Sequence, residues 1–508
     1  MVRNLTSVWI ALSVRVGLSP SIAGDSPQFS VVTEVLVSSG DPSPDGNGVF
    51  GDQFTPPVLN NSGQALFVAS LLATTNPDPI DDLGLFRASS GAVNAMTRGG
   101  DPSAAGNLLD LDVLRVAGQL TRRQLLGIDQ AGEVAFLASD SDNQDAIYRS
   151  DGQALSTVVQ QGEDLPFGDN LRIGAAVLGF LMNDVDQLAY LLDSDTQNLL
   201  VRSDGLVTEA VFGTGQALPG ANTLIALRAF GMNNSGEVIA RLNVANDAFG
   251  HFVGDPSNVR QINQTGAAAP DGLGTFIVDP RLPAAINDSS TVALVGGVDD
   301  VTTDYVGVYL EEGTGLTEVT RTGNGTVGGT LLAVASGLQL NDRGDLLYAI
   351  LSSDNNRLQR LVMRRDGAVL PVASEGDLVI PAEGGLINSF NGYSLNDAGQ
   401  VLIFATVVRP GLPQALGLYL FDPLAGLTEV VRVGQSLAGG TITALGAALP
   451  LWPLEANTIG NAQTGLNDAG QVAFSYTLDS GENGVALSTV SIELPDMLFK
   501  DSFEALIP

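Results

Sequence analysis

The chain has 508 residues, 44% of them hydrophobic, and a formal net charge of −33 at pH 7. That length and apolar content are ample for a large core, whereas so acidic a surface disfavours nucleic acids and anionic membranes, which are themselves polyanions. The chain contains no cysteine and a single histidine. Disulfides, thiol chemistry and a metal site with several histidine ligands are therefore excluded.

The first 24 residues have the features of an export signal. Arg3 supplies a positive charge, an apolar stretch follows it, and small residues lead up to Ala23. The alternative is an unstructured start. No apolar run in the chain reaches the ~18 residues needed to cross a bilayer, so we expect no membrane insertion.

A short motif then recurs eight times, at a spacing of about 50–55 residues except for longer first and last steps, and such a period predicts a repeat architecture. Each copy begins with Asn or Asp, usually has Gly in the fourth position, and is followed by apolar residues. The Asn side chain can bond the backbone of its own turn, and Gly adopts a positive φ without strain, so each copy predicts a hairpin turn. Asp186 is tolerable in the Gly position, whereas Ser290 is a poorer fit. The structural turn residues are predicted to be Asn60, Gly63, Gly132, Asn233, Gly236, Asn341, Gly344, Asn396, Gly399, Asn467 and Gly470.

Each unit reads as four short strands, of which the inner ones are apolar on both faces and the last is half polar. Residues 32–37 match a fourth strand with no motif before it, while the last unit lacks a clear fourth strand. The sequence therefore predicts an all-β fold, an eight-bladed β-propeller of four-stranded blades over residues 25–495, closed by its N-terminal strand. Residues 496–508 form a C-terminal tail. The alternative is an open solenoid or stacked array.

Extra residues in the first and last steps fall mainly in residues 104–124 and 437–464, which spacing places in loops that join blades. One carries Arg122 and Arg123, and the other carries Trp452. Long loops on a rigid scaffold often carry function. We predict a ligand-binding site formed by these three residues on one face near the closure seam; the alternative is that the loops only cover the core.

Loops after the second strand of several units are rich in Asp and Asn. Closely spaced oxygen ligands suit Ca²⁺, which makes Asp140, Asp142 and Asp145 candidate ligands. None of these loops has the full pattern of a helix–loop–helix calcium site. The alternative is a set of solvated turns.

The repeat resembles the NxxGxxAF tandem repeats of a family of secreted bacterial proteins of the choice-of-anchor type. Asn467, Gly470, Ala473 and Phe474 match that pattern fully, and other copies depart from it. Residues 498–504 resemble a terminal signature of exported Gram-negative proteins, with Ser502 where Gly is usual. The resemblance implies a secreted or cell-surface bacterial protein, and it implies no activity because the role of the family is unassigned.

Catalytic motifs are scarce. His251 occupies a strand position where packing is the expected role, and the chain has neither a Gly-x-Ser-x-Gly elbow nor a phosphate-binding Gly-Lys-Ser/Thr loop. We predict a non-enzymatic, monomeric binding scaffold for a glycan or a protein. The alternative is a polysaccharide-acting enzyme with paired carboxylates in the central funnel. Perturbed carboxylates at the ring axis would favour the enzyme, and small apolar residues there would favour binding.

Overall fold

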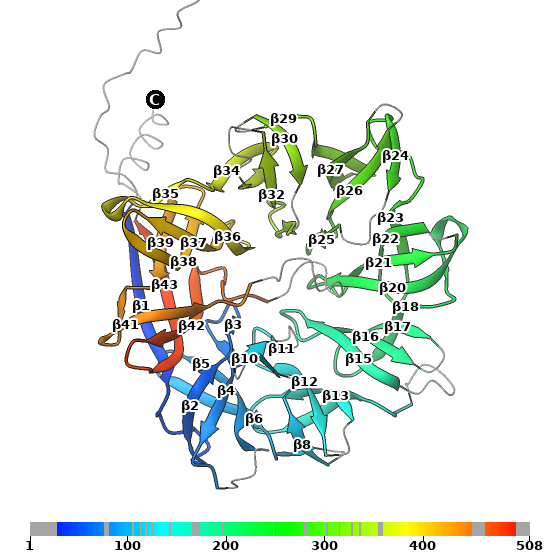
Figure 1. Cartoon of the computed structure of the whole chain (residues 1–508). Helices are drawn as coiled ribbons and strands as arrows, with labels where there is room; N and C mark the ends of the chain where they lie inside the picture. The colour runs from blue at the N-terminus through cyan, green and yellow to red at the C-terminus, as the bar shows by residue number, and fades with distance from the viewer. Residues whose placement is uncertain are drawn as a thin grey trace, which may run out of the picture.

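The computed structural model is a closed ring of eight small antiparallel β-sheets, the blades (Figure 1). The structure describes residues 28–75, 81–103, 106–111, 113–116, 119–122, 126–141, 144–164, 173–194, 197–246, 248–277, 282–300, 303–313, 315–326, 329–334, 337–353, 359–449 and 463–493. The all-β, eight-bladed propeller predicted from the repeats is confirmed.

Blades 1 to 4 follow one another along the chain. Blade 1 contains β2 (Val49–Phe54), β3 (Val58–Leu59), β4 (Ala65–Leu72), β5 (Leu83–Ser89) and β6 (Ala92–Arg98). Blade 2 contains β7 (Pro102–Ser103), β8 (Gly106–Asp110), β11 (Leu126–Ile128), β12 (Val134–Asp140), β13 (Asp145–Ser150) and β14 (Leu155–Gln160), with a separate hairpin of β9 (Val113–Val116) and β10 (Gln119–Arg122). Blade 3 contains β15 (Ile173–Met182), β16 (Leu188–Ser194), β17 (Asn198–Ser203) and β18 (Thr208–Gly213). Blade 4 contains β19 (Ala217–Leu218), the 3₁₀ turn η2 (Pro219–Ala221), β20 (Asn222–Met232), β21 (Val238–Val244), β22 (Ala248–Gly254) and β23 (Val259–Gln264).

Blades 5 to 8 complete the ring. Blade 5 contains β24 (Gly274–Ile277), β25 (Ala284–Ile286), β26 (Val292–Asp300), β27 (Tyr305–Glu312) and β28 (Gly315–Arg321). Blade 6 contains β29 (Gly325–Thr326), β30 (Gly329–Val334), β31 (Gln339–Leu340), β32 (Leu346–Ser352), β33 (Gln359–Arg365) and β34 (Ala368–Ser374). Blade 7 contains β35 (Leu378–Ile380), η3 (Pro381–Glu383), β36 (Gly385–Leu395), β37 (Val401–Arg409), β38 (Leu412–Asp422) and β39 (Gly426–Arg432). Blade 8 contains β40 (Ser436–Leu437), β41 (Gly440–Gly446), β42 (Gln471–Leu478), β43 (Asn483–Glu493) and β1 (Gln28–Ser38).

Blade 8 joins the two ends of the chain. β1 pairs antiparallel with β43, with Ser30 opposite Ser491 and Val37 opposite Val485. The predicted closure by the N-terminal strand is therefore confirmed. It gives blade 8 the fourth strand that the last repeat lacks, and it lets blade 8 pack against blade 1.

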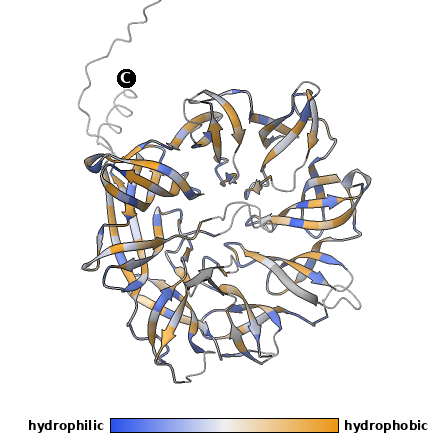
Figure 2. Ribbon diagram, viewed as in Figure 1, coloured by the Kyte–Doolittle hydropathy of each residue, from blue (hydrophilic) through white to orange (hydrophobic). Residues whose placement is uncertain are grey.

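Apolar side chains fill every interface between neighbouring blades. At the closure seam, Val37 and Val485 of blade 8 pack with Phe50 and Phe67 of blade 1, and comparable clusters lie at the other interfaces. The second strand of a blade lies between neighbouring strands and is almost wholly buried, as β4 is in blade 1. The fourth strand has alternating exposed and partly buried residues over part of its length, as β6 does. Figure 2 shows the resulting bands of hydrophobic residues along the strands. The hydrophobic effect across these interfaces therefore holds the ring together.

The first strand of each blade is irregular. In blades 3, 4 and 7 it is one long strand with bulges, as in β36. In blades 1, 2, 5 and 6 it is interrupted, and two short pieces pair with opposite ends of the same second strand, as β24 and β25 do with β26. Extra residues can be accommodated at such an interruption without loss of the second strand's pairing.

Candidate functional site

The motif turns meet at the centre of the ring. In blade 7, Asn396 Oδ1 accepts a hydrogen bond from Gln400 N at 2.7 Å, which closes the turn. Its Nδ2 donates to Gln400 Oε1 at 3.0 Å and to the carbonyl of Asn467, in the next blade, at 2.8 Å. Gly399 has a φ of 81°. The predicted hairpin turn is confirmed, and its Asn also ties one blade to the next.

Seven of the eight copies make this inter-blade bond. The donor–acceptor distances lie between 2.7 and 3.2 Å, and the last bond runs from Asn467 back to the carbonyl of Asn60, which closes the circle. Asp129 of blade 2 has no amide to donate; there the backbone N–H of Gln130 donates to the carbonyl of Asp184 at 3.2 Å. The ring of turns therefore has one weaker junction, between blades 2 and 3.

All six predicted motif glycines have positive φ, from 73° to 88°. Asp186 and Ser290 occupy the same left-handed position, with φ of 66° and 64°. Ser290 N donates to the carbonyl of Asn287 at 3.0 Å, as in the other turns. The Ser290 copy, which the sequence marked as a poorer fit, thus forms the same turn.

The second residues of the eight turns form an inner circle, here called the axial ring: Asn61, Gln130, Asp184, Asn234, Asp288, Asp342, Asp397 and Asp468. From blade 3 round to blade 1, each backbone N–H donates to the side-chain Oδ1 of the next member, at 2.6 to 2.9 Å. Sequence reasoning missed this circle, although every copy carries Asp, Asn or Gln at its second position.

The carboxyl groups of the axial ring crowd one another. Partial desolvation, strengthened by Asp397 and Asp288, raises the pKa of Asp342 to about 7. Desolvation and the charges of other ring carboxylates also raise the pKa of Asp184 and Asp397. Perturbed carboxylates therefore do lie at the axis, the feature expected of an enzyme, but the Oδ1 atoms of Asp342 and Asp397 already accept hydrogen bonds from the neighbouring turns.

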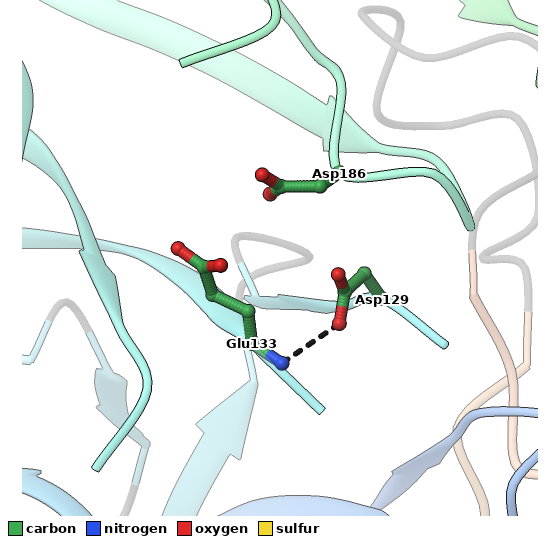
Figure 3. Close-up of side chains that lie close together, drawn as sticks. All are labelled: Asp129, Glu133 and Asp186. Atoms are coloured by element: carbon green, nitrogen blue, oxygen red, sulfur yellow. Dashed lines mark hydrogen bonds between the residues drawn. The ribbon is translucent and has the colours of Figure 1, made fainter. Parts of the chain in front are cut away.

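A second acidic cluster lies at the weaker junction (Figure 3). One carboxylate oxygen from each of Asp129, Glu133 and Asp186 lies within 4.8 Å of the others. Asp129 Oδ1 accepts from Glu133 N at 2.7 Å, and Asp186 pairs with Arg149 at 2.8 Å. Burial raises the pKa of Asp186 to about 6, Arg149 opposes that rise, and the two neighbouring carboxylates add to it. Three hard oxygen ligands could hold Ca²⁺, but Arg149 already supplies a positive charge there.

The predicted calcium loop differs from this cluster. Asp140 is buried, and its oxygens accept hydrogen bonds from Gln144 N at 3.0 Å and Gln160 Nε2 at 2.9 Å. Asp145 Oδ1 accepts from Ser139 Oγ at 2.7 Å. Asp142 lies outside the described residues. Calcium binding at this loop stays a prediction.

Both insertions arise within first strands and not in the loops between blades. In blade 2, β8 and β11 pair with β12 on either side of residues 111–125. In blade 8, β41 pairs with β42 before residues 447–465, and Leu466 bridges to Val472 after them. The spacing argument misplaced them because it could not show that the segments on both sides pair with the same second strand.

The described end of the second insertion contacts β11, the strand that follows the first insertion. Gln463 Oε1 accepts from Ile128 N at 2.7 Å, and Gln463 Nε2 donates to the carbonyl of Ile128. Thr464 also accepts from Leu59 N of blade 1 at 2.8 Å. Arg122 is the last residue of β10, while Trp452, Arg123 and the side chain of Arg122 lie outside the described residues. The structure therefore does not test whether Trp452, Arg122 and Arg123 lie together, and the predicted binding site stays a prediction.

His251 lies in β22 and is wholly buried. Its Nδ1 is 2.8 Å from Asn263 Oδ1, and burial lowers its pKa to about 4. A neutral imidazole away from solvent is part of the packing, as the sequence suggested. Among the residues that the structure describes, no helix is long and apolar enough to cross a bilayer.

Three solved structures illustrate distant likenesses to the chain. A protein from Lactobacillus plantarum has a TM-score of 0.33 and 12% identity, covering 73% of this chain and 95% of its own. A puromycin-hydrolyzing peptidase of Mycobacterium tuberculosis has a TM-score of 0.35 and 13% identity, and the match covers 76% of this chain and 55% of the peptidase. The Aleuria aurantia lectin, solved with alpha-methyl-L-fucoside, has a TM-score of 0.24 and 9% identity, and the match covers 63% of this chain and 94% of the lectin. Values this low transfer no ligand or activity.

No curated protein matches the chain. A single family model, by contrast, matches it repeatedly, over residues 28–139, 112–357 and 332–496. These matches together span the whole propeller, in keeping with its repeats. The chain therefore belongs to the family of unknown function DUF7453.

Proposed function

We propose that this protein is a non-enzymatic, exported scaffold that binds a glycan or a protein beside its closure seam. One observation carries the proposal: Gln463, in the insertion of blade 8, is hydrogen-bonded to Ile128 of β11, the strand that resumes the first strand of blade 2 after its own insertion. Only blade 1 lies between blade 8 and blade 2 in the ring. A rigid ring on which the ends of two insertions lie near each other provides a scaffold for a composite binding surface.

The residues of that surface set the chemistry of the ligand. Trp452 offers a large amphipathic face for stacking on a sugar or packing on a protein. Arg122 and Arg123 add positive charge to a chain with 23 basic and 56 acidic residues. A ligand with a cyclic or apolar body and an anionic group suits both features.

A glycan array probed with and without Ca²⁺ tests this proposal. The variant Trp452→Ala/Arg122→Ala/Arg123→Ala should lose at least ~10-fold in affinity for any glycan bound by the wild type, since each removed contact contributes about 1 kcal/mol or more. Arg228→Ala, an exposed arginine of β20 in blade 4, is the matched control and should bind normally. Unchanged binding by the triple variant would contradict the proposal. A large fall in its urea midpoint would instead make the insertions structural cover.

The alternative, a polysaccharide-acting enzyme, has one observation in its favour. Asp342 has a pKa raised to about 7, by desolvation and by Asp397 and Asp288, and a carboxylic acid beside a carboxylate is the pair used in glycoside hydrolysis. Release of reducing ends from a polysaccharide panel, abolished separately by Asp342→Asn and Asp288→Asn, would establish it. If no polysaccharide is cleaved, or if both variants cleave normally, the axial ring is not a catalytic site.

The same proposal includes export of the protein and its relationship to the secreted bacterial proteins with NxxGxxAF repeats. If residues 1–24 are a signal removed near Ala23, the protein recovered from the culture medium begins close to Gly24. An intact N-terminus on exported protein would contradict this. Light scattering of that material should give the mass of a monomer.

A further inference from the structure

We propose that the axial ring is a proton-dependent clasp: the blades are held together more tightly when a proton is shared between Asp288 and Asp342, beside the charge of Asp397, than when all three carboxyls are ionised. This inference concerns regulation of the fold by pH. It is independent of whichever ligand the seam surface binds.

The geometry places these three carboxyls in one hydrogen-bonded run. Asp288 N donates to Asp342 Oδ1 at 2.7 Å, and Asp342 N donates to Asp397 Oδ1 at 2.9 Å. The side chains of Asp342 and Asp288 are also close enough to interact, and this contact contributes to the raised pKa of Asp342. Two carboxyl groups can share a hydrogen bond only if one of them holds a proton, because ionised carboxylates are acceptors alone. Protonation therefore adds a link between blades 5 and 6 that is absent at high pH.

The surrounding charges favour that proton. Asp184 and Asp468 face the run from the other turns and repel its negative charge. Arg343, in the same turn as Asp342, is exposed and donates to the carbonyl of Ala398 at 3.3 Å. Desolvation and the acidic neighbours accordingly raise the pKa of Asp342 to about 7 and raise that of Asp397.

The sign of the pH effect follows from linkage. Asp342 binds its proton near pH 7 in the folded ring and near its ordinary value of 3.8 in the unfolded chain. The folded state thus holds more protons between these values, so the protein gains stability as pH falls below about 7. The gain is lost again as pH rises through 7.

Two other groups also make stability depend on pH, and they limit the pH range in which stability reports on the axial ring. His251, whose pKa is lowered by burial to about 4, makes the protein less stable as pH falls below about 6.5, the ordinary histidine value. Asp186, raised to about 6 by burial, acts in the same direction as the ring but at lower pH. The range from pH 8.5 to 6.5 therefore reports mainly on the axial ring.

Urea denaturation of the full chain across that range tests the clasp. The wild-type unfolding constant should fall about fourfold in total as pH decreases from 8.5 to 6.5, because the raised pKa of Asp342, about 7, lies near the lower end of that range. Asp342→Asn, which keeps an oxygen acceptor and cannot ionise, should be more resistant to urea than wild type at pH 8.5 and should show a flatter pH profile. Asp304→Asn removes the same charge at an exposed position outside the ring and should follow the wild-type profile.

Infrared spectroscopy supplies a second readout that does not depend on unfolding. Near pH 6.5 the wild type should show a stronger protonated-carboxyl absorption than Asp342→Asn, in which Asp186, with a pKa of about 6, still contributes. The clasp is refuted if the wild type and Asp342→Asn have parallel pH profiles, or if the absorption is identical in both. Should Asp342→Asn fail to fold, the infrared comparison of wild type at pH 8.5 and 6.5 still decides whether the proton is present.

Discussion

The weaker junction between blades 2 and 3 provides a direct test of how the ring is held together. Asp129 stands where seven other copies have an Asn, and it is 5% exposed. We expect Asp129→Asn to stabilise the protein. The new amide can donate to the carbonyl of Asn183, as its counterparts do, and one negative charge leaves the cluster with Glu133 and Asp186.

The magnitude can be worked from these contacts. A buried neutral hydrogen bond contributes about 0.5–1.5 kcal/mol net. Two charges 4.8 Å apart repel by roughly 3.5 kcal/mol at an effective dielectric constant of 20, of which Arg149 and solvent cancel a large share. We expect a net gain of about 1–3 kcal/mol at pH 8. The gain should shrink at pH 5, because Asp186, whose pKa burial raises to about 6, is then protonated.

The reciprocal substitution is Asn233→Asp. Asn233 Nδ2 donates to the carbonyl of Asn287 and to Glu237 Oε2, both at 3.0 Å. The substitution recreates the Asp–Glu arrangement of blade 2 in blade 4 and should destabilise by about 2–4 kcal/mol at pH 8. Urea denaturation followed by circular dichroism measures both variants. Destabilisation by Asp129→Asn at pH 8, together with a neutral Asn233→Asp, would refute the view that these amides hold the ring.

Three further outcomes follow from the same contacts. Gly470→Val should destabilise by about 1 kcal/mol or more, because Gly470 has φ 73° and an added Cβ would lie 3.0 Å from Gln400 Oε1; an unchanged thermal midpoint would argue against a required left-handed turn. Deletion of residues 28–38 should leave β43 unpaired and lower the thermal midpoint far more than deletion of residues 496–508, and equal effects would mean that β1 does not close the ring. Between pH 6.5 and 4, His251 should cost wild type up to about 3 kcal/mol against the gains from Asp342 and Asp186, so His251→Gln should gain stability relative to wild type as pH falls in parallel urea titrations.

Most of the fold was predictable because the signals are local. The turn motif needs only an Asn side chain that folds back on its own backbone and a residue that tolerates positive φ, as in Asn467 and Gly470. The closing strand was predictable because residues 32–37 repeat the pattern of a fourth strand without the motif that precedes one. Strand periodicity and turn chemistry operate within a few residues, so the chain displays them directly.

The sites were decided by contacts between blades. Asp288 and Asp342 are ordinary turn residues in the sequence, and they become neighbours only because the closed ring places the backbone of one turn against the side chain of the next. Asp129 and Asp186 likewise depart from the repeat in different copies, and only the junction of blades 2 and 3 brings them together. Residues so far apart in the chain approach one another only after every interface has packed, so their pKa values and pairings are properties of the ring and not of any one repeat.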